Sequence, residues 1–332
     1  MNELKRRRWK RWLIRLGIVV AIGFAALNIL AYRHAYTMMH FEVGKPRTGL
    51  PESLSVGQKI GVLIWGVNIP RPRAGTNATA LGTSASSLQI VEPNSIKLGA
   101  WYCAGPVKSP LVILFHGYTG EKSGTLAEGK VFREMGCSVL LVDFRGSGDS
   151  SESYTTIGYD EAEDVAAAVR YARQNLPPSK IVLYGISMGG AAVLRAVHSC
   201  GVKPDAIIVE AVFDSLLHTV RHRFQAMGTP SFPSAELLIF WGGVQEGFNG
   251  FAHNPVDYAK SVTCPILFLH GSADPRAHTD EARRVYEAVP GPKQFKEFPD
   301  VGHAATVIRY PEQWRDTVSN FLNQATLKSE SR

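Results

Sequence analysis

The sequence has only four cysteines, no internal repeat, no heptad pattern and little net charge outside one short segment. The cysteines form no C-x-x-C pair, which argues against a zinc site of the usual spacing. The missing repeats and heptads exclude solenoid and coiled-coil architectures. Charged residues are 20% and hydrophobic residues 45% of 332 residues, which excludes a largely disordered chain. The length fits one large domain with an appendage or two modest domains.

The net charge of +7 and the pI near 9.2 come almost entirely from the N-terminus. Seven basic residues and one acidic residue lie within positions 1–15, so this segment carries +6 and the other 317 residues carry +1. A basic surface spread over a folded domain would indicate a nucleic-acid partner. Basic charge confined to the first 15 residues does not indicate such a partner, and we predict no nucleic-acid partner.

An uncharged apolar run follows the basic cluster, at residues 16–32, with Asn28 as its only strongly polar side chain. A helix over residues 12–32 would be about 32 Å long, enough to span a bilayer core of about 30 Å. A buried core helix should show a polar face, and none is visible. The run therefore predicts a transmembrane signal anchor, with a cleaved signal peptide as the alternative.

Basic residues before the apolar run set its orientation. Seven precede the run and only Arg33 closely follows it, so the positive-inside rule keeps the N-terminus cytoplasmic. The prediction is a single-pass membrane protein whose remaining chain is exported, or a secreted or periplasmic protein if the segment is cleaved. Isolated cysteines beside apolar runs are usually buried thiols, so we predict free thiols, with a disulfide as the alternative in an oxidising compartment. The four cysteines are Cys103, Cys137, Cys200 and Cys264.

Four segments follow from these patterns: an anchor at 1–36, a linker or N-terminal extension at 37–87, a folded domain at 88–325 and a tail at 326–332. Small and polar residues without periodicity predict the linker. Within the domain, strand-like and helical runs alternate, which predicts a mostly parallel sheet with helices on both faces. The strand-like runs are 88–91, 95–103, 111–116, 137–143, 180–184, 206–210, 265–270 and 294–298, and the main helical runs are 122–135, 159–175, 188–199 and 279–289.

Ligands of such sheets bind beyond the carboxyl ends of the strands, so the residues that follow each strand are the candidates for chemistry. After the fifth run the chain continues Gly185, Ile186, Ser187, Met188, Gly189 and then becomes helical. A G-x-S-x-G sequence between a strand and a helix is typical of a nucleophile elbow. Gly185 and Gly189 allow the tight turn, and Ser187 is the predicted nucleophile.

A serine hydroxyl needs a base to take its proton, and an imidazole base needs a carboxylate to orient it. Asp274 follows the strand at 265–270, and His303 follows the last predicted strand. We predict these two as the acid and the base. Asp214, after the strand at 206–210, is the alternative acid.

The third strand is followed by His116, Gly117, Tyr118, Thr119 and Gly120. This turn places the backbone amide of Tyr118 beside the serine. Together with the amide of Met188, it is the predicted oxyanion hole, supported by His116 and Gly117.

Five features in this order resemble the α/β-hydrolase superfamily of serine hydrolases: the turn at 116–120, the Asp-Phe-Arg-Gly-Ser-Gly loop at 143–148, the turn at 185–189, Asp274 and His303. The resemblance covers roughly residues 88–323. Among subfamilies the chain is most similar to small-lidded, often membrane-anchored esterases and acyl hydrolases, including prolyl-oligopeptidase-like members. It implies acylation of Ser187 and deacylation by water, with His303 as the base in both steps. The loop at 143–148 is expected to pack beside the site.

The resemblance also implies a helical lid, at about residues 215–260, whose aromatic and aliphatic side chains suit an acyl chain or simply pack onto the body. The leading hypothesis is a carboxylic-ester hydrolase acting on a small-molecule ester or acyl substrate. The alternatives are a peptidase or amidase and a non-catalytic binding protein of the same fold. We predict no cofactor and no metal, because the helical pair His218 and His222 lacks the Glu of H-E-x-x-H. The sequence does not indicate an oligomeric state.

Overall fold

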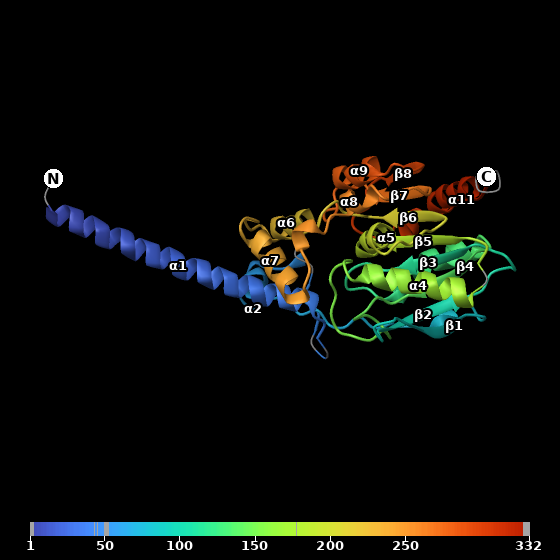
Figure 1. Cartoon of the computed structure of the whole chain (residues 1–332), viewed down its shortest axis with the longest axis horizontal. Coiled ribbons are helices and arrows are strands. Elements are labelled where there is room, and N and C mark those ends of the chain that lie inside the picture. Colours follow the sequence, from blue (N-terminus) through green and yellow to red (C-terminus); the bar gives the residue numbers. More distant parts are fainter. Residues whose placement is uncertain (1–2, 43, 45, 50–52, 177, 328–332) are drawn as a thin grey trace.

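The computed structural model of the chain describes residues 3–42, 44, 46–49, 53–176 and 178–327. Its centre is one eight-stranded sheet in the order β1-β2-β4-β3-β5-β6-β7-β8 (Figure 1). The strands are β1 Ser86–Val91, β2 Lys97–Cys103, β3 Leu111–Phe115, β4 Ser138–Val142, β5 Ile181–Ile186, β6 Ala206–Glu210, β7 Ile266–Gly271 and β8 Lys293–Phe298. Strand β2 pairs antiparallel with both β1 and β4, and the other neighbouring strands are parallel. The predicted mostly parallel sheet is confirmed.

Strand β3 shows why the sheet is covered on both faces. All five of its residues are buried, and their side chains alternate between two separate hydrophobic cores. Leu111, Ile113 and Phe115 belong to one core, and Val112 and Leu114 belong to the other. A strand that is apolar on both faces must lie between two layers of helices.

Two helical layers cover the sheet. The first core includes side chains from α4 Glu161–Asn175, α5 Met188–Ser199, α8 Pro255–Ala259 and α9 Thr279–Ala288. The second core includes side chains from α3 Leu126–Glu134, which follows η3 Lys122–Thr125, and from α11 Pro311–Leu327, which follows α10 Thr306–Arg309. The α/β-hydrolase arrangement therefore has helices on both faces, as predicted.

The predicted lid contains α6 Leu216–Met227, α7 Ser234–Glu246, η4 Gly250–Ala252 and α8. Helix α1, Glu3–Met39, projects away from the domain, and its C-terminal end lies beside α2, α6 and α7 (Figure 1). Within the described chain, α1 is the one helix long and apolar enough to cross a membrane, with a mean hydropathy of 2.3 over its most apolar window.

The segment predicted as a linker is more ordered than its composition indicated. It contains α2 Val56–Trp65 and η2 Ala78–Leu81, and α1 continues to Met39 rather than ending near residue 36. Helix α2 begins with a capping box formed by Ser55 and Gln58. The sequence analysis missed α2, whose apolar side chains Val56, Ile60, Ile64 and Trp65 are largely exposed and therefore do not form the buried face that an amphipathic pattern would predict. The predicted free thiols are confirmed, since all four cysteines are unpaired.

A buried ion pair joins the loops that follow β3 and β4. Lys122, whose side chain is fully buried, donates from Nζ to Asp143 Oδ2 at 2.6 Å and to Asp149 Oδ2 at 2.7 Å. Asp143 also accepts the backbone amides of Lys122 and Asp149. We call the group of Lys122, Asp143 and Asp149 the charged brace. It holds the loop at 143–148 against the loop that follows β3.

Replacing Lys122 with methionine is expected to destabilise the fold by about 3–5 kcal/mol, because it leaves the buried Asp143 carboxylate without its counter-charge. The matched control is Lys130→Met, which removes an exposed lysine from the neighbouring helix α3. Urea unfolding of the detergent-solubilised full chain, followed by circular dichroism, measures both. Equal midpoints for the two variants would contradict a structural role for the brace.

Candidate active site

Ser187 occupies a strained turn between β5 and α5. Its backbone has φ 53° and ψ −115°, a combination that a residue other than glycine rarely adopts. The two flanking glycines are required sterically. A Cβ at Gly189 would lie 2.4 Å from the carbonyl oxygen of Phe115, and one at Gly185 would lie 2.5 Å from the Gly189 backbone. The turn therefore holds the Ser187 hydroxyl at the carboxyl edge of the sheet.

His303 lies between Ser187 and Asp274. Its Nε2 is 3.0 Å from Ser187 Oγ, and its Nδ1 is 2.7 Å from Asp274 Oδ2. Ser187 follows β5, Asp274 follows β7 and His303 follows β8. In the sheet, β6 lies between β5 and β7, and β8 is next to β7. A hydroxyl, an imidazole and a carboxylate in this order are able to activate the hydroxyl as a nucleophile.

Asp274 is held in its ionised form. Burial alone would raise its pKa, but the hydrogen bond and charge of His303 and the amides of Ala277 and Arg276 bring the pKa below its usual range. Those amides donate to Oδ1 at 3.0 and 2.8 Å, so the other carboxylate oxygen stays directed at the imidazole. An ionised carboxylate in this position fixes Nδ1 as the protonated nitrogen of His303.

The turn at 116–120 and the start of α5 both lie beside Ser187. The turn at 116–120 approaches it so closely that a Cβ on Gly117 would lie 3.6 Å from Ser187 Cβ. Met188 begins helix α5, where amides have no partner within the helix. The assignment of the Tyr118 and Met188 amides to an oxyanion site stays a prediction.

His116 supports this turn from within the core. Its Nε2 accepts the Phe144 amide at 3.1 Å, so the proton resides on Nδ1, which donates to the Gly117 carbonyl at 2.8 Å. Burial lowers the pKa of His116, which keeps the ring neutral. The Tyr118 hydroxyl donates to the Met38 carbonyl and ties the same turn to the end of α1.

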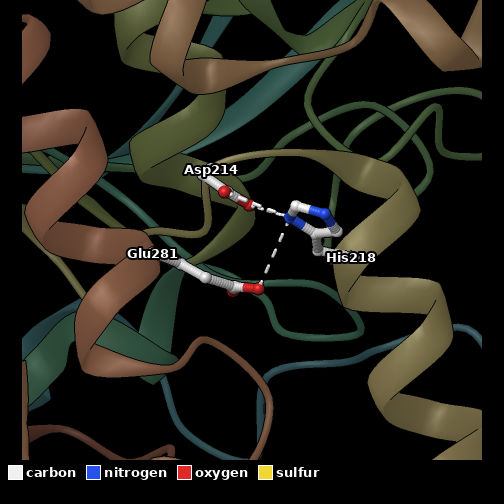
Figure 2. A group of neighbouring side chains, drawn as sticks. All are labelled: Asp214, His218 and Glu281. Carbon is white, nitrogen blue, oxygen red and sulfur yellow. Dashed lines mark hydrogen bonds and ion pairs between the residues drawn. The ribbon is translucent and has the colours of Figure 1, made fainter.

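Asp214, the alternative acid, lies in a different cluster. Figure 2 shows Asp214, His218 and Glu281 together, with His218 Nδ1 2.9 Å from Asp214 Oδ1 and 3.7 Å from Glu281 Oε1. Arg284 donates to the other Asp214 oxygen at 2.8 Å. Burial first, then the charge of Asp214, raises the pKa of Glu281 to about 8.

The ligand atoms of Asp214, His218 and Glu281 lie within 4.8 Å of one another, close enough to hold a metal ion. The guanidinium of Arg284 already balances the Asp214 charge, which disfavours a further cation. His222 lies next to this cluster: its Nδ1 lies 3.0 Å from the Arg276 carbonyl, its Nε2 lies 3.5 Å from Glu281 Oε1, and its ring stacks on His278. This cluster packs α6 onto the loop that carries Asp274.

A cavity of about 510 Å³ opens over Ser187 and His303. Its walls come from the turn at 116–120, from α6 and from the segment predicted as a linker. Three arginines line it, and the described lining residues include no aspartate or glutamate: Arg47, Arg223 and Arg276. Sequence analysis missed these arginines, because they come from distant segments and share no motif.

The chain is similar to a known protein family and to several proteins of bacteria and yeast. A model of the prolyl oligopeptidase family matches residues 125–329. The uncharacterized protein YqkD of Bacillus subtilis is 25% identical over 233 residues, which cover 69% of this chain and 76% of that protein. The uncharacterized membrane protein YNL320W of Saccharomyces cerevisiae is 26% identical over 243 residues, covering 73% and 80%.

Among solved structures, an esterase of Pyrococcus furiosus, Pf2001, superimposes with a TM-score of 0.65 at 23% identity. The match covers 77% of this chain and 97% of the esterase. At this identity the likeness concerns the fold, which is the α/β-hydrolase fold that the sequence resembled. The family match spans more than half of the chain, so the chain belongs to the prolyl oligopeptidase family and is a hydrolase with an α/β-hydrolase fold.

Proposed function

We propose that the protein is a carboxylic-ester hydrolase that works through an acyl-enzyme on Ser187. The observation that carries the proposal is the continuous pair of hydrogen bonds from Ser187 through His303 to Asp274 beneath an accessible cavity. An esterase among the structural neighbours supports the ester as the bond that is cleaved.

In the first half-reaction, Ser187 Oγ attacks the ester carbonyl carbon while His303 Nε2 takes the hydroxyl proton. The carbonyl oxygen becomes an oxyanion that accepts hydrogen bonds from the amides of Tyr118 and Met188. Collapse of this intermediate breaks the bond to the alcohol, which leaves with the proton from His303. Asp274 stays ionised and stabilises the imidazolium formed in between.

In the second half-reaction, water attacks the acyl group on Ser187 and gives its proton to His303. A second oxyanion forms in the same place and collapses to release the carboxylic acid. The proton returns to Ser187 Oγ, which restores the enzyme. The cavity of about 510 Å³ is large enough for a drug-sized ester.

Cleavage of a peptide or amide bond is the second candidate, favoured by membership of the prolyl oligopeptidase family. It requires His303 to protonate an amine leaving group. The strands of the described chain all belong to one sheet, so a β-propeller is not part of the described residues. Rates with a proline-containing peptide p-nitroanilide and with p-nitrophenyl butyrate distinguish the two candidates.

The proposal places the enzyme on a membrane, anchored by α1 with its N-terminus in the cytoplasm. Seven basic residues before the apolar run and the exposure of that run in the structure support this placement. Trp9, Trp12, Tyr32 and Tyr36 lie near its two ends, where aromatic side chains favour the membrane interface.

Replacing Asp274 with asparagine is expected to lower kcat for p-nitrophenyl butyrate about ten-thousandfold, because His303 loses the group that sets its tautomer. Asp214→Asn is the matched control, since Asp214 contacts His218 and Arg284 instead. Ser187→Ala is expected to remove fluorophosphonate labelling entirely. A larger loss of kcat in Asp214→Asn than in Asp274→Asn would reverse the assignment of the acid.

The arginines of the cavity predict a preference for anionic esters. Arg223→Gln is expected to lower kcat/KM about fivefold more for mono-(p-nitrophenyl) succinate than for p-nitrophenyl butyrate, since a partly exposed charge pair contributes about 1 kcal/mol. Arg221→Gln, on the same helix but outside the cavity, is the control. Steady-state kinetics at low salt provide the measurement, and equal losses on both esters would contradict the preference.

Protease access to sealed inverted membrane vesicles tests the topology. The exported catalytic domain is expected to be protected inside these vesicles and digested only after detergent is added. The N-terminal segment before the apolar run is expected to be cut without detergent. Digestion of the domain in intact vesicles would place it in the cytoplasm and refute export.

A further inference from the structure

A second cavity, of about 220 Å³, lies against the C-terminal half of α1. Helices α1, α2, α6 and α7 all contribute to its walls, and most of the lining side chains are hydrocarbon. They include Leu30, Ala31, Val62, Leu63, Phe224 and Leu238. An apolar cavity of this kind suits a hydrocarbon group and has few partners to offer water.

This membrane-side cavity shares part of its wall with the cavity over Ser187. The residues that line both are Met38, Val62, Val67, Val220, Arg223 and Met227. The two cavities therefore adjoin, and a flexible chain that reaches the membrane-side cavity from Ser187 must pass these six side chains. Arg47 and Arg276 line only the cavity over Ser187, whereas Arg223 lines both cavities.

The lid is docked on α1 at the end of its apolar run. Asn28, the only strongly polar side chain of that run, accepts a hydrogen bond on Oδ1 from Trp241 Nε1 at 3.1 Å. The Trp241 ring also meets Tyr32 edge-on, with centroids 5.4 Å apart. Tryptophan and tyrosine with a polar partner are typical of the boundary between bilayer and water.

Exposed apolar side chains also lie on two helices that line the membrane-side cavity, α2 and α7. Phe240 on α7 and Val56, Ile60 and Trp65 on α2 are between 48% and 75% exposed. Such a cluster on two elements that flank a membrane helix fits contact with lipid. The membrane-side cavity therefore lies where acyl chains of the bilayer come closest to the domain.

We propose that the substrate is an ester whose acyl chain resides in the bilayer, and that this chain occupies the cavity between α1, α2, α6 and α7 while its carbonyl reaches Ser187. The proposal rests on the proposed esterase function and names its substrate class. Each methylene group transferred into the cavity favours binding by a factor of about four relative to water.

The test blocks the membrane-side cavity from two sides. Ala31→Phe on α1 and Ser234→Phe on α7 each place a ring in this cavity, and neither residue lines the cavity over Ser187. Ile29→Phe and Val244→Phe are matched controls on the same helices, with side chains that are 63% and 55% exposed. The full-length protein in liposomes is assayed with p-nitrophenyl laurate and p-nitrophenyl butyrate.

Both blocking variants are expected to lower the laurate-to-butyrate ratio of kcat/KM at least about tenfold, the factor that burial of two methylene groups contributes. Both controls are expected to keep the wild-type ratio. An unchanged ratio in the blocking variants overturns the acyl route while leaving the esterase function intact. Absence of butyrate turnover in the wild-type protein overturns the esterase function itself, and butyrate turnover that survives Ser187→Ala overturns the acyl-enzyme on Ser187.

A second measurement uses the wild-type protein and does not depend on the folding of a variant. Ser187 Oγ displaces fluoride from a dodecyl fluorophosphonate with a terminal diazirine, and light then cross-links the end of the chain to its neighbours. Peptide mapping is expected to find the cross-link within residues 27–38, 56–67 or 220–238. Cross-links confined to other parts of the chain overturn the proposed route.

Discussion

The contact between the Gly189 backbone and the Phe115 carbonyl oxygen sets the geometry on which the rest of the site depends. It brings α5 against the end of β3, and any side chain at Gly189 would separate them. The same approach forces Ser187 to a positive φ, at a cost of about 1–3 kcal/mol that the two buried cores offset. The turn at 116–120 also lies close to the serine, since a Cβ on Gly117 would be 3.6 Å from Ser187 Cβ.

Two further sets of contacts keep that geometry rigid. The Lys122–Asp143 pair joins the loops after β3 and β4, and His116 bonds Phe144 across the same gap. On the opposite side, the loop that carries Asp274 is held by its own amides and by the cluster around Asp214 and His218. Groups that neither touch nor bind a substrate therefore determine the positions of those that do.

Strand β3 and the turn at Ser187 were predictable because local sequence dictates them: an unbroken apolar run must be buried on both faces, and G-x-S-x-G between strand and helix forces a tight turn. Asp274 was preferred to Asp214 because it ends a His-Gly-x-x-Asp sequence, which resembles the commoner pattern of the superfamily, and only the fold places Asp274 against His303. Helix α2 and the arginines over the site escaped prediction. Their positions depend on tertiary contacts with α1 and α6, which no spacing in the sequence encodes.

The central claim is that Ser187 forms a covalent acyl intermediate. Rapid quenching of the full-length protein during turnover of p-nitrophenyl butyrate, followed by peptide mass spectrometry, tests it most directly. The account predicts a butyryl group on the peptide that contains Ser187, formed in a burst that matches one site per chain. Turnover without any covalent adduct, or with the acyl group on another residue, would contradict it.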